Sequence, residues 1–125
     1  MAERRVVSVV DDDESVRESL PDFLRSFGFE VQAFASAEAF LRSESVHGTG
    51  CLILDVAMPH MTGPDLRREL ARRGHDIPAV FITAQSAEQV RALGSSPGVV
   101  AWLFKPFTDT AILEAVNTAL SRAAN

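Results

Sequence analysis

The feature that most constrains the fold is a set of four short apolar runs, each of which ends in a polar residue. The runs are Val6–Val10 before Asp11, Cys51–Leu54 before Asp55, Ala79–Ile82 before Thr83, and Trp102–Phe104 before Lys105. Continuous apolar runs of this length are typical of strands buried on both faces of a parallel sheet. The carboxyl ends of such strands share one edge, where ligands bind. We therefore expect carboxylates, a hydroxyl and an ammonium group to converge there, a set that can hold a divalent cation and a phosphoryl group.

The segments between the strands have helical periodicity. The first places five apolar residues on one helical face: Val16, Leu20, Phe23, Leu24 and Phe27. Ser15 is the expected N-cap of this helix, and Pro21 is expected to kink it or loosen its first turns. Because strands and helices alternate five times, we predict a (βα)5 fold. This is a doubly wound, flavodoxin-like α/β architecture with a five-stranded parallel sheet in the order 2-1-3-4-5.

Turn and cap residues locate the other elements. We expect a second strand at Glu30–Phe34, a small helix capped by Ser36, and a loop at Gly48–Gly50. A third helix opens at Gly63 and ends at Gly74.

The C-terminal third of the chain contains the last three expected elements. A fourth helix starts near Ser86, carries Val90 and Leu93, and is interrupted at Gly94–Pro97. The fifth strand is Val99–Phe104, and the last helix is capped by Thr108.

The composition is that of one globular domain, which we place at residues 1–125. A net charge of -5 and a pI near 5.1 argue against direct nucleic-acid binding and against binding to anionic membranes. The single cysteine, Cys51, is expected in the core, which excludes a disulfide framework and fits a reducing compartment. We see no signal peptide and no membrane span, so a cytoplasmic location is expected. One basic cluster is expected on a solvated helix face: Arg67, Arg68, Arg72 and Arg73.

Three consecutive carboxylates, Asp11–Asp13, follow the first strand. Oxygen ligands of this kind suit magnesium, although an exposed acidic loop or an acidic first helical turn explains them equally well. Asp55, which ends a neighbouring strand, favours a shared site, because a carboxylate can act as a nucleophile and form an aspartyl phosphate. Thr83 could donate a hydrogen bond to a phosphoryl group, and Lys105 could neutralise it or pair with Asp55.

In combination, these motifs resemble the receiver domain of two-component response regulators, over roughly Val6 to Ala119. The matching motifs are Asp11-Asp12, Asp55 through Gly63, Thr83-Ala84 and Lys105-Pro106-Phe107. The stretch Ser36–Leu41 and the ending Lys105–Phe107 are similar to the FixJ-like branch. The resemblance implies a phosphorelay switch, rather than a dedicated enzyme, that receives its phosphoryl group from a sensor histidine kinase or a phosphotransfer protein.

The resemblance also implies a metal site and a phosphoacceptor. Asp55 would accept the phosphoryl group. Asp12, Asp55 and the backbone carbonyl of Ala57 would bind Mg²⁺ directly, with Mn²⁺ as a substitute. Asp11 would act on the metal through water or by orienting its shell.

Further roles are implied on the phosphoryl side of the site. Thr83, Ala84 and Lys105 would contact the phosphoryl group. Thr83 and Trp102 would form a switch pair, in which the hydroxyl follows the phosphoryl group and the aromatic ring turns inward behind it. The resemblance further implies a cis bond before Pro106.

The segment expected to form the fourth helix, which normally signals outward in the family, departs from the family pattern. The interruption at Gly94–Pro97 predicts a short or irregular fourth helix, which leaves open a homodimer through that helix, Val99–Phe104 and the last helix. A C-terminal DNA-binding output domain can follow in FixJ-like proteins, but these residues encode none. Ala57 and Gln85 occupy positions that tune dephosphorylation in the family.

Other classes of protein remain as alternatives. Asp11-x-Asp13 mimics the nucleophile motif of haloacid-dehalogenase-type phosphohydrolases, in which Asp11 would be the nucleophile, although no later acidic pair appears. An interaction module without chemistry is a further alternative. A flavin or dinucleotide protein is disfavoured, because no glycine-rich turn follows the first strand. The histidines have no metal-ligand spacing in the sequence: His47, His60 and His75.

Overall fold

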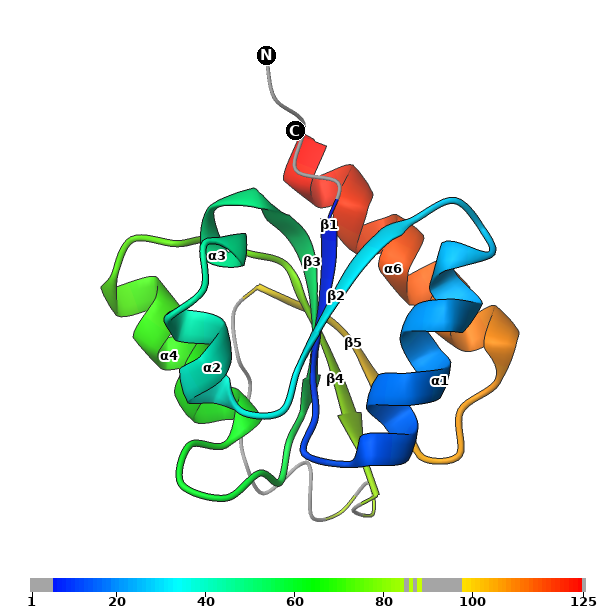
Figure 1. Cartoon of the computed structure of the whole chain (residues 1–125), viewed down its shortest axis with the longest axis horizontal. Coiled ribbons are helices and arrows are strands. Elements are labelled where there is room, and N and C mark those ends of the chain that lie inside the picture. The colour runs from blue at the N-terminus through cyan, green and yellow to red at the C-terminus, as the bar shows by residue number, and fades with distance from the viewer. Residues whose placement is uncertain (1–5, 85, 87, 89–97, 125) are drawn as a thin grey trace.

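The computed structural model describes residues 6–84, 86, 88 and 98–124. Its strands form one parallel sheet in the order β2-β1-β3-β4-β5, which confirms the predicted order (Figure 1). The strands are β1 (Val6–Val10), β2 (Glu30–Phe34), β3 (Thr49–Asp55), β4 (Ala79–Thr83) and β5 (Val99–Phe104).

Helices cover both faces of this sheet (Figure 1). On one face lie α1 (Glu14–Arg25) and α6 (Asp109–Ala124), and on the other lie α2 (Ala37–Leu41), α3 (Ser45–Gly48) and α4 (Gly63–Arg72). The predicted fourth helix and the Gly94–Pro97 interruption fall almost entirely outside the described residues. No helix in the described part of the chain is long and apolar enough to cross a lipid bilayer.

The core consists of two apolar clusters, one on each face of the sheet. All seven residues of β3 are buried, and they alternate between the clusters: Cys51 and Ile53 face one, whereas Leu52 and Leu54 face the other. Burial raises the pKa of the Cys51 thiol to about 12. Cys51 is therefore a core residue, as predicted.

Helix α1 differs in its details from the prediction. Its N-cap is Asp13 rather than Ser15, because the Asp13 carboxylate accepts hydrogen bonds from both the backbone amide (2.9 Å) and the hydroxyl (2.8 Å) of Ser15. The helix continues through the buried Pro21 and ends at Arg25.

Two side chains lie in surroundings that differ from those predicted. Phe27 is 57% exposed, because α1 ends before it. Its ring packs edge-on against the ring of Phe23, with the two ring centroids 5.2 Å apart. Arg67 is buried, and its Nη1 donates to the carbonyl of Ile77 at 3.2 Å, so it is not on the solvated face. The other members of the basic cluster are exposed as predicted: Arg68, Arg72 and Arg73.

The chain between β2 and β3 contains one helical turn more than predicted. The expected loop at Gly48–Gly50 is replaced by the end of α3 and the start of β3. The Thr49 hydroxyl explains this, because it donates to the carbonyl of Ser45 (2.5 Å) and is hydrogen-bonded to the Ser8 hydroxyl of β1 (2.7 Å). Ser36 and Thr108 cap α2 and α6 as predicted.

Candidate functional site

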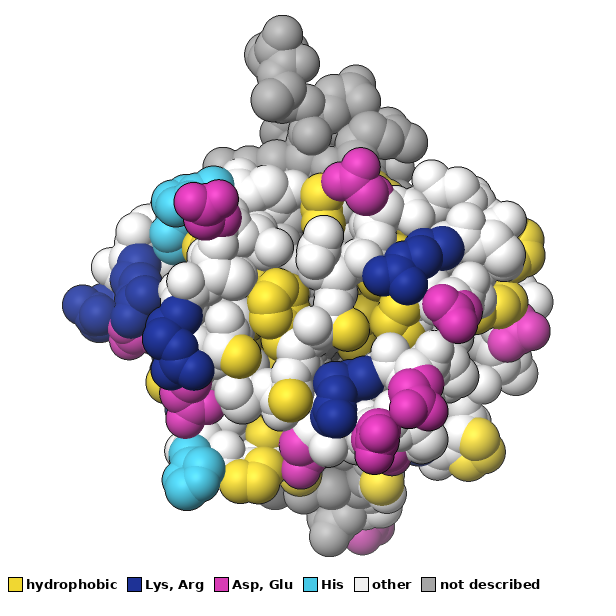
Figure 2. Space-filling view, in the orientation of Figure 1, with side chains coloured by type: hydrophobic (Ala, Val, Ile, Leu, Met, Phe, Trp, Pro, Cys, Tyr) yellow, Lys and Arg dark blue, Asp and Glu magenta, His cyan; other side chains and the backbone are white. Residues whose placement is uncertain are grey.

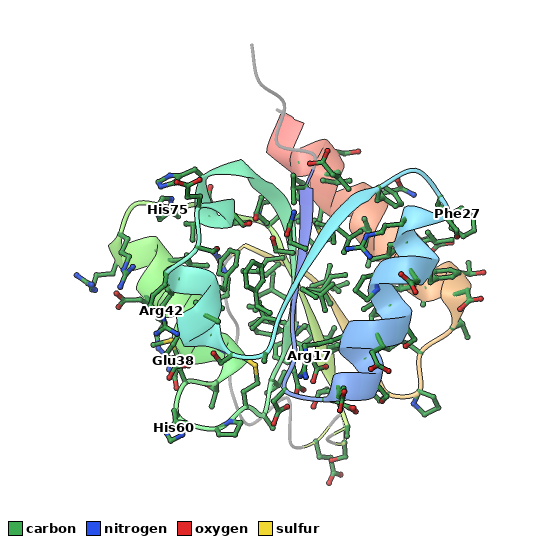
Figure 3. The ribbon with its side chains drawn as sticks, in the orientation of Figure 1. Arg17, Phe27, Glu38, Arg42, His60 and His75 are labelled. Carbon is green, nitrogen blue, oxygen red and sulfur yellow. The ribbon has the colours of Figure 1, made fainter. Side chains whose placement is uncertain are left out.

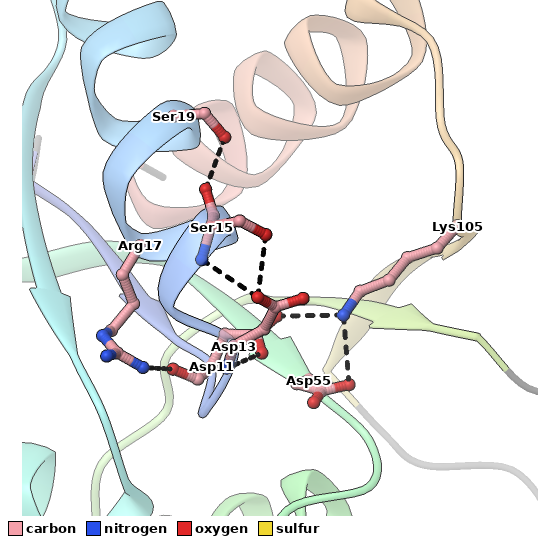
Figure 4. A network of polar contacts seen from close by, with 7 residues as sticks. All are labelled: Asp11, Asp13, Ser15, Arg17, Ser19, Asp55 and Lys105. Carbon is pink, nitrogen blue, oxygen red and sulfur yellow. Dashed lines mark hydrogen bonds and ion pairs between the residues drawn. The ribbon is translucent and has the colours of Figure 1, made fainter.

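The candidate site lies at the carboxyl edge of the sheet, where the predicted polar residues follow their strands. The register explains their convergence, because Val10 pairs with Leu54 in the neighbouring strand and Thr83 pairs with Phe104. Asp11 and Asp55 therefore leave adjacent strands at the same level, and Lys105 follows β5 on the same edge. Figure 4 shows these three side chains pointing toward one another.

Three carboxylates form a cluster at this edge. Asp11, Asp12 and Asp55 each offer an oxygen within 4.8 Å of the others. Asp11 is fully buried, Asp55 is 6% exposed, and Asp12 is exposed to solvent. No other group of three histidines, cysteines or carboxylates in the described residues is arranged in this way. Carboxylate oxygens arranged in this way, two from buried residues and one from an exposed residue, suit a hard divalent cation.

Lys105 is the cation that the chain itself supplies to this cluster. Its Nζ donates to Asp11 Oδ2 at 3.2 Å and lies 3.9 Å from Asp55 Oδ1 (Figure 4). Its backbone amide donates to the carbonyl of Thr83 at 2.8 Å, and the bond from Lys105 to Pro106 is cis. The hydrogen bond to Thr83 holds Lys105 at the end of β5, where its ammonium group lies beside the carboxylates of Asp11 and Asp55.

Hydrogen bonds hold both the side chain and the backbone of Asp11 in place. Its Oδ1 accepts the backbone amide of Asp13 (2.9 Å), and its own amide donates to the carbonyl of Phe34 (3.1 Å). Arg17 Nη1 donates to the Asp11 carbonyl at 3.0 Å. Sequence analysis did not single out Arg17; the available signal was a cation in the helix that follows the acidic run. Both oxygens of Asp11 are thus engaged within the protein.

The pKa of the Asp55 carboxyl is shifted strongly from its ordinary value. Burial, and then the negative charge of Asp11, raise the pKa of the Asp55 carboxyl to about 7, although Lys105 opposes the shift. The hydrogen bond and charge of Asp12 raise this pKa further. A carboxylate in such surroundings is stabilised by any added positive charge, so the donor set fits a divalent metal ion.

The backbone after Asp55 returns closely on itself. The amide of Val56 donates to the Ile82 carbonyl (3.0 Å), and the amide of Gly63 donates to the Val56 carbonyl (3.1 Å). A Cβ at Gly63 would lie only 2.7 Å from the Asp55 carbonyl oxygen, so only glycine fits there. The intervening loop leaves Ala57 exposed at the open end of the site.

The remaining predicted residues lie on β4, β5 and the chain just beyond β4. Thr83 is fully buried, and Ala84 follows it in an exposed position. Trp102 pairs with Phe81 across the two strands, and their rings meet edge to face with centroids 4.6 Å apart. The Trp102 ring is partly buried and packs against the core cluster beneath the site. Gln85 lies outside the described residues.

Comparison with known proteins identifies a family. The sequence model of the family called response regulator receiver domain matches residues 7–117 of this chain. Response regulator protein TmoT of Ectopseudomonas mendocina is 41% identical over 118 residues, which cover 94% of this chain and 54% of that protein. Transcriptional regulatory protein FixJ of Rhizobium meliloti is 39% identical over 113 residues, which cover 90% of this chain and 55% of that protein. The chain therefore spans about half the length of these curated relatives.

Solved structures agree with the sequence relatives. The response regulator StyR matches with a TM-score of 0.82 and 41% identity, over 95% of this chain and 60% of that one. The structure of FixJ-N matches with a TM-score of 0.79 and 38% identity, over 93% of both chains. The likeness covers the fold and the elements that position the site.

Proposed function

The chain belongs to the response regulator receiver domain family and is a FixJ-like receiver, and from this we propose that it is a phosphorylation-controlled switch. Asp55 accepts a phosphoryl group from a sensor histidine kinase or a phosphotransfer protein. The observation that carries the proposal is the position of Asp55. Its carboxylate lies 3.9 Å from the Lys105 ammonium group and within 4.8 Å of the oxygens of Asp11 and Asp12.

The chemistry asks for an ionised Asp55 and for neutralised charge. An oxygen of Asp55 attacks phosphorus, a P–O bond forms, and the P–N bond to the donor histidine breaks. Asp12, Asp55 and the Ala57 carbonyl would hold Mg²⁺, with Asp11 acting through water or by orienting the metal's shell. When bound, the ion would supply positive charge that neutralises the phosphoryl oxygens during transfer. Lys105 favours the ionised form of Asp55, because its charge lowers the pKa that burial raises. Transfer and the later autodephosphorylation are thus self-catalysed properties of a switch, not the activity of a dedicated enzyme.

The phosphorylated state recruits residues already beside Asp55. A phosphoryl group adds negative charge and acceptor oxygens. Lys105, Thr83 and the Ala84 amide contact those oxygens in our proposal. Movement of the Thr83 hydroxyl toward the phosphoryl group opens space into which the Trp102 ring turns. This movement changes the affinity of the face that includes β5 and α6 for a second copy of the chain or for another partner.

The relatives support a proposal for the biological output. FixJ is a transcriptional regulatory protein, and this chain spans about half of its length. We propose that the phosphorylated receiver controls transcription through a DNA-binding output domain, and that it works in the cytoplasm, where a kinase can reach it.

The rival proposal, a phosphohydrolase with Asp11 as its nucleophile, has less support. Asp11 is fully buried, and its two oxygens accept hydrogen bonds from Asp13 and Lys105. Asp55 keeps 6% of its surface exposed, and its Oδ1 lies 3.9 Å from the Lys105 ammonium group, beyond hydrogen-bond distance. Asp55 is therefore the better candidate for attack on an incoming phosphoryl group.

Intact mass measurement tests this assignment. The wild type, Asp55→Asn, Asp11→Asn and the exposed control Asp22→Asn are incubated with Mg²⁺ and acetyl phosphate, or with a phosphorylated sensor kinase. We expect one phosphoryl adduct on the wild type and on Asp22→Asn, and none on Asp55→Asn. An adduct that persists in Asp55→Asn but disappears in Asp11→Asn would favour the phosphohydrolase. Absence of any adduct with both donors would contradict phosphoacceptor function altogether.

A further inference from the structure

Two histidines that are distant in the sequence lie in contact in the structure. The rings of His47 and His75 meet with centroids 5.4 Å apart and an interplanar angle of 69°. The spacing of the histidines in the sequence does not indicate this contact. His60 is not part of this pair: Figure 3 shows it at the lower left of the view, whereas His75 lies at the upper left.

Separate elements hold the two histidines in place. His47 belongs to α3, and its amide donates to the Glu44 carbonyl at 3.1 Å. His75 follows the end of α4, where Gly74 has a φ of +84° and the His75 amide donates to the Leu70 carbonyl at 2.8 Å. Both backbone positions are thus set by hydrogen bonds and do not depend on the contact between the rings.

The spacing of the rings matches that of two imidazoles bound to one metal ion. A metal ion at about 2.0–2.1 Å from a nitrogen of each ring, with a near-tetrahedral angle between them, holds the ring centroids roughly 5 Å apart. The observed centroid separation of 5.4 Å is close to this value. Neutral imidazole is a preferred ligand of zinc, copper and nickel ions, and magnesium prefers oxygen.

The pair is accessible and lies away from the acidic cluster. His47 is exposed and His75 is partly exposed, and Figure 2 shows histidine side chains at the surface in the corner where Figure 3 labels His75. This corner adjoins the start of β3, whereas Asp55 stands at its end. Within the described residues no third histidine, cysteine or carboxylate completes a set there, so water would fill the other coordination positions.

We propose that His47 and His75 form a two-histidine site for a transition-metal ion such as Zn²⁺, Ni²⁺ or Cu²⁺, at the edge of the sheet opposite the acidic cluster. The proposal rests on the ring geometry and is independent of the proposed phosphoryl transfer.

Calorimetric titration with NiCl₂ tests the site on the whole chain without an affinity tag. Millimolar Mg²⁺ is present throughout to occupy the acidic cluster. We expect the wild type and the control His60→Gln to bind one Ni²⁺ equally. His47→Gln and His75→Gln should each weaken binding by about tenfold or more, because one remaining imidazole cannot chelate. Asp12→Asn is titrated as a fifth protein. Equal affinity in the wild type and all three histidine variants, or weakened binding in Asp12→Asn alone, would overturn the proposal.

A second measurement needs no variant and therefore holds even if a substitution disturbs folding. Substoichiometric Ni²⁺ or Cu²⁺ broadens the NMR signals of nearby ring protons. We expect the ring signals of two of the three histidines to disappear together, while those of His60 persist. Broadening of all three to the same extent, or of His60 first, would show that the ion binds without the His47–His75 pair.

Discussion

Asp55 is the residue whose surroundings differ most from those of an ordinary aspartate. Its carboxyl is almost fully buried beside a second buried carboxylate, Asp11, and one ammonium group serves both. Burial and the Asp11 charge raise the pKa of Asp55 from 3.8 to about 7. The residue is therefore suited to bind a cation or a phosphoryl group at a cost in stability of the unliganded fold.

This raised pKa predicts a pH dependence of folding. The folded state holds the Asp55 proton more tightly than the unfolded state does, so this group's stabilising contribution is present below pH about 4 and is lost as pH rises toward about 7. At pH 8 without metal, Asp55→Asn should raise the free energy of unfolding by about 1–3 kcal/mol, less than the full conversion of the shift at about 1.4 kcal/mol per unit. Urea unfolding at several pH values measures this.

Two controls accompany that prediction. Asp22→Asn, on the exposed surface of α1, should change the free energy of unfolding by less than about 0.5 kcal/mol at every pH. Millimolar Mg²⁺ should reduce the difference in free energy of unfolding between the wild type and Asp55→Asn, because the cation stabilises the ionised carboxylate. A wild type that is more stable than Asp55→Asn at pH 8 without metal would contradict the assigned cause.

At the scale of elements, the site depends on how closely α4 approaches the end of β3. Gly63, the first residue of α4, leaves no room for a side chain against the Asp55 carbonyl oxygen. The helix start is fixed by a capping box in which Thr62 and Asp65 exchange hydrogen bonds, each 3.2 Å long. The position of the loop that carries Ala57 thus depends on this one contact between helix and strand.

Gly63→Ala tests the close approach. The added Cβ would lie 2.7 Å from backbone that cannot move without shifting Asp55, so we expect a loss of about 1–3 kcal/mol in urea unfolding. Gly48→Ala is the matched control, because it stands in open space at the end of α3 and has no positive φ. That control should change stability by less than about 0.5 kcal/mol. Equal effects of the two substitutions would show that α4 is not held by this contact.

At the scale of the whole molecule, the question is how a change at Asp55 reaches the edge of the sheet. Thr83 ends β4 and Trp102 lies in β5, the edge strand, where its ring packs on Phe81. The path from Asp55 at the end of β3 to the surface of β5 therefore crosses two neighbouring strands, β4 and β5.

Fluorescence can follow this path, because Trp102 is the single tryptophan of the chain. We expect phosphorylation to change the emission of Trp102 in the wild type and not in Asp55→Asn. Thr83→Ala should reduce the change when compared at equal adduct fraction by mass, because it removes the hydroxyl that we propose to move. Thr110→Ala, on the exposed start of α6, is the control and should respond like the wild type. An undiminished change in Thr83→Ala would exclude the coupling between Thr83 and Trp102.

Much of the fold and part of the site could be predicted from local patterns. The strand runs, their order in the sheet and the caps at Ser36 and Thr108 are confirmed, because apolar periodicity and capping chemistry act over a few residues. Details that depend on competition between neighbours were predicted less well. Asp13 caps α1 in place of Ser15, since its carboxylate reaches two donors at once.

The sequence alone determined the strand order and the edge at which Asp11, Asp55, Thr83 and Lys105 would gather, since buried parallel strands leave their carboxyl ends on one side. Only the tertiary structure decided which charges touch. Lys105 is hydrogen-bonded to Asp11 and lies farther from Asp55. Arg67 is buried and hydrogen-bonded to the Ile77 carbonyl, and His47 in α3 contacts His75, which follows α4. These contacts join residues from separate elements, and such distances depend on how the helices pack on the sheet, which no local pattern encodes.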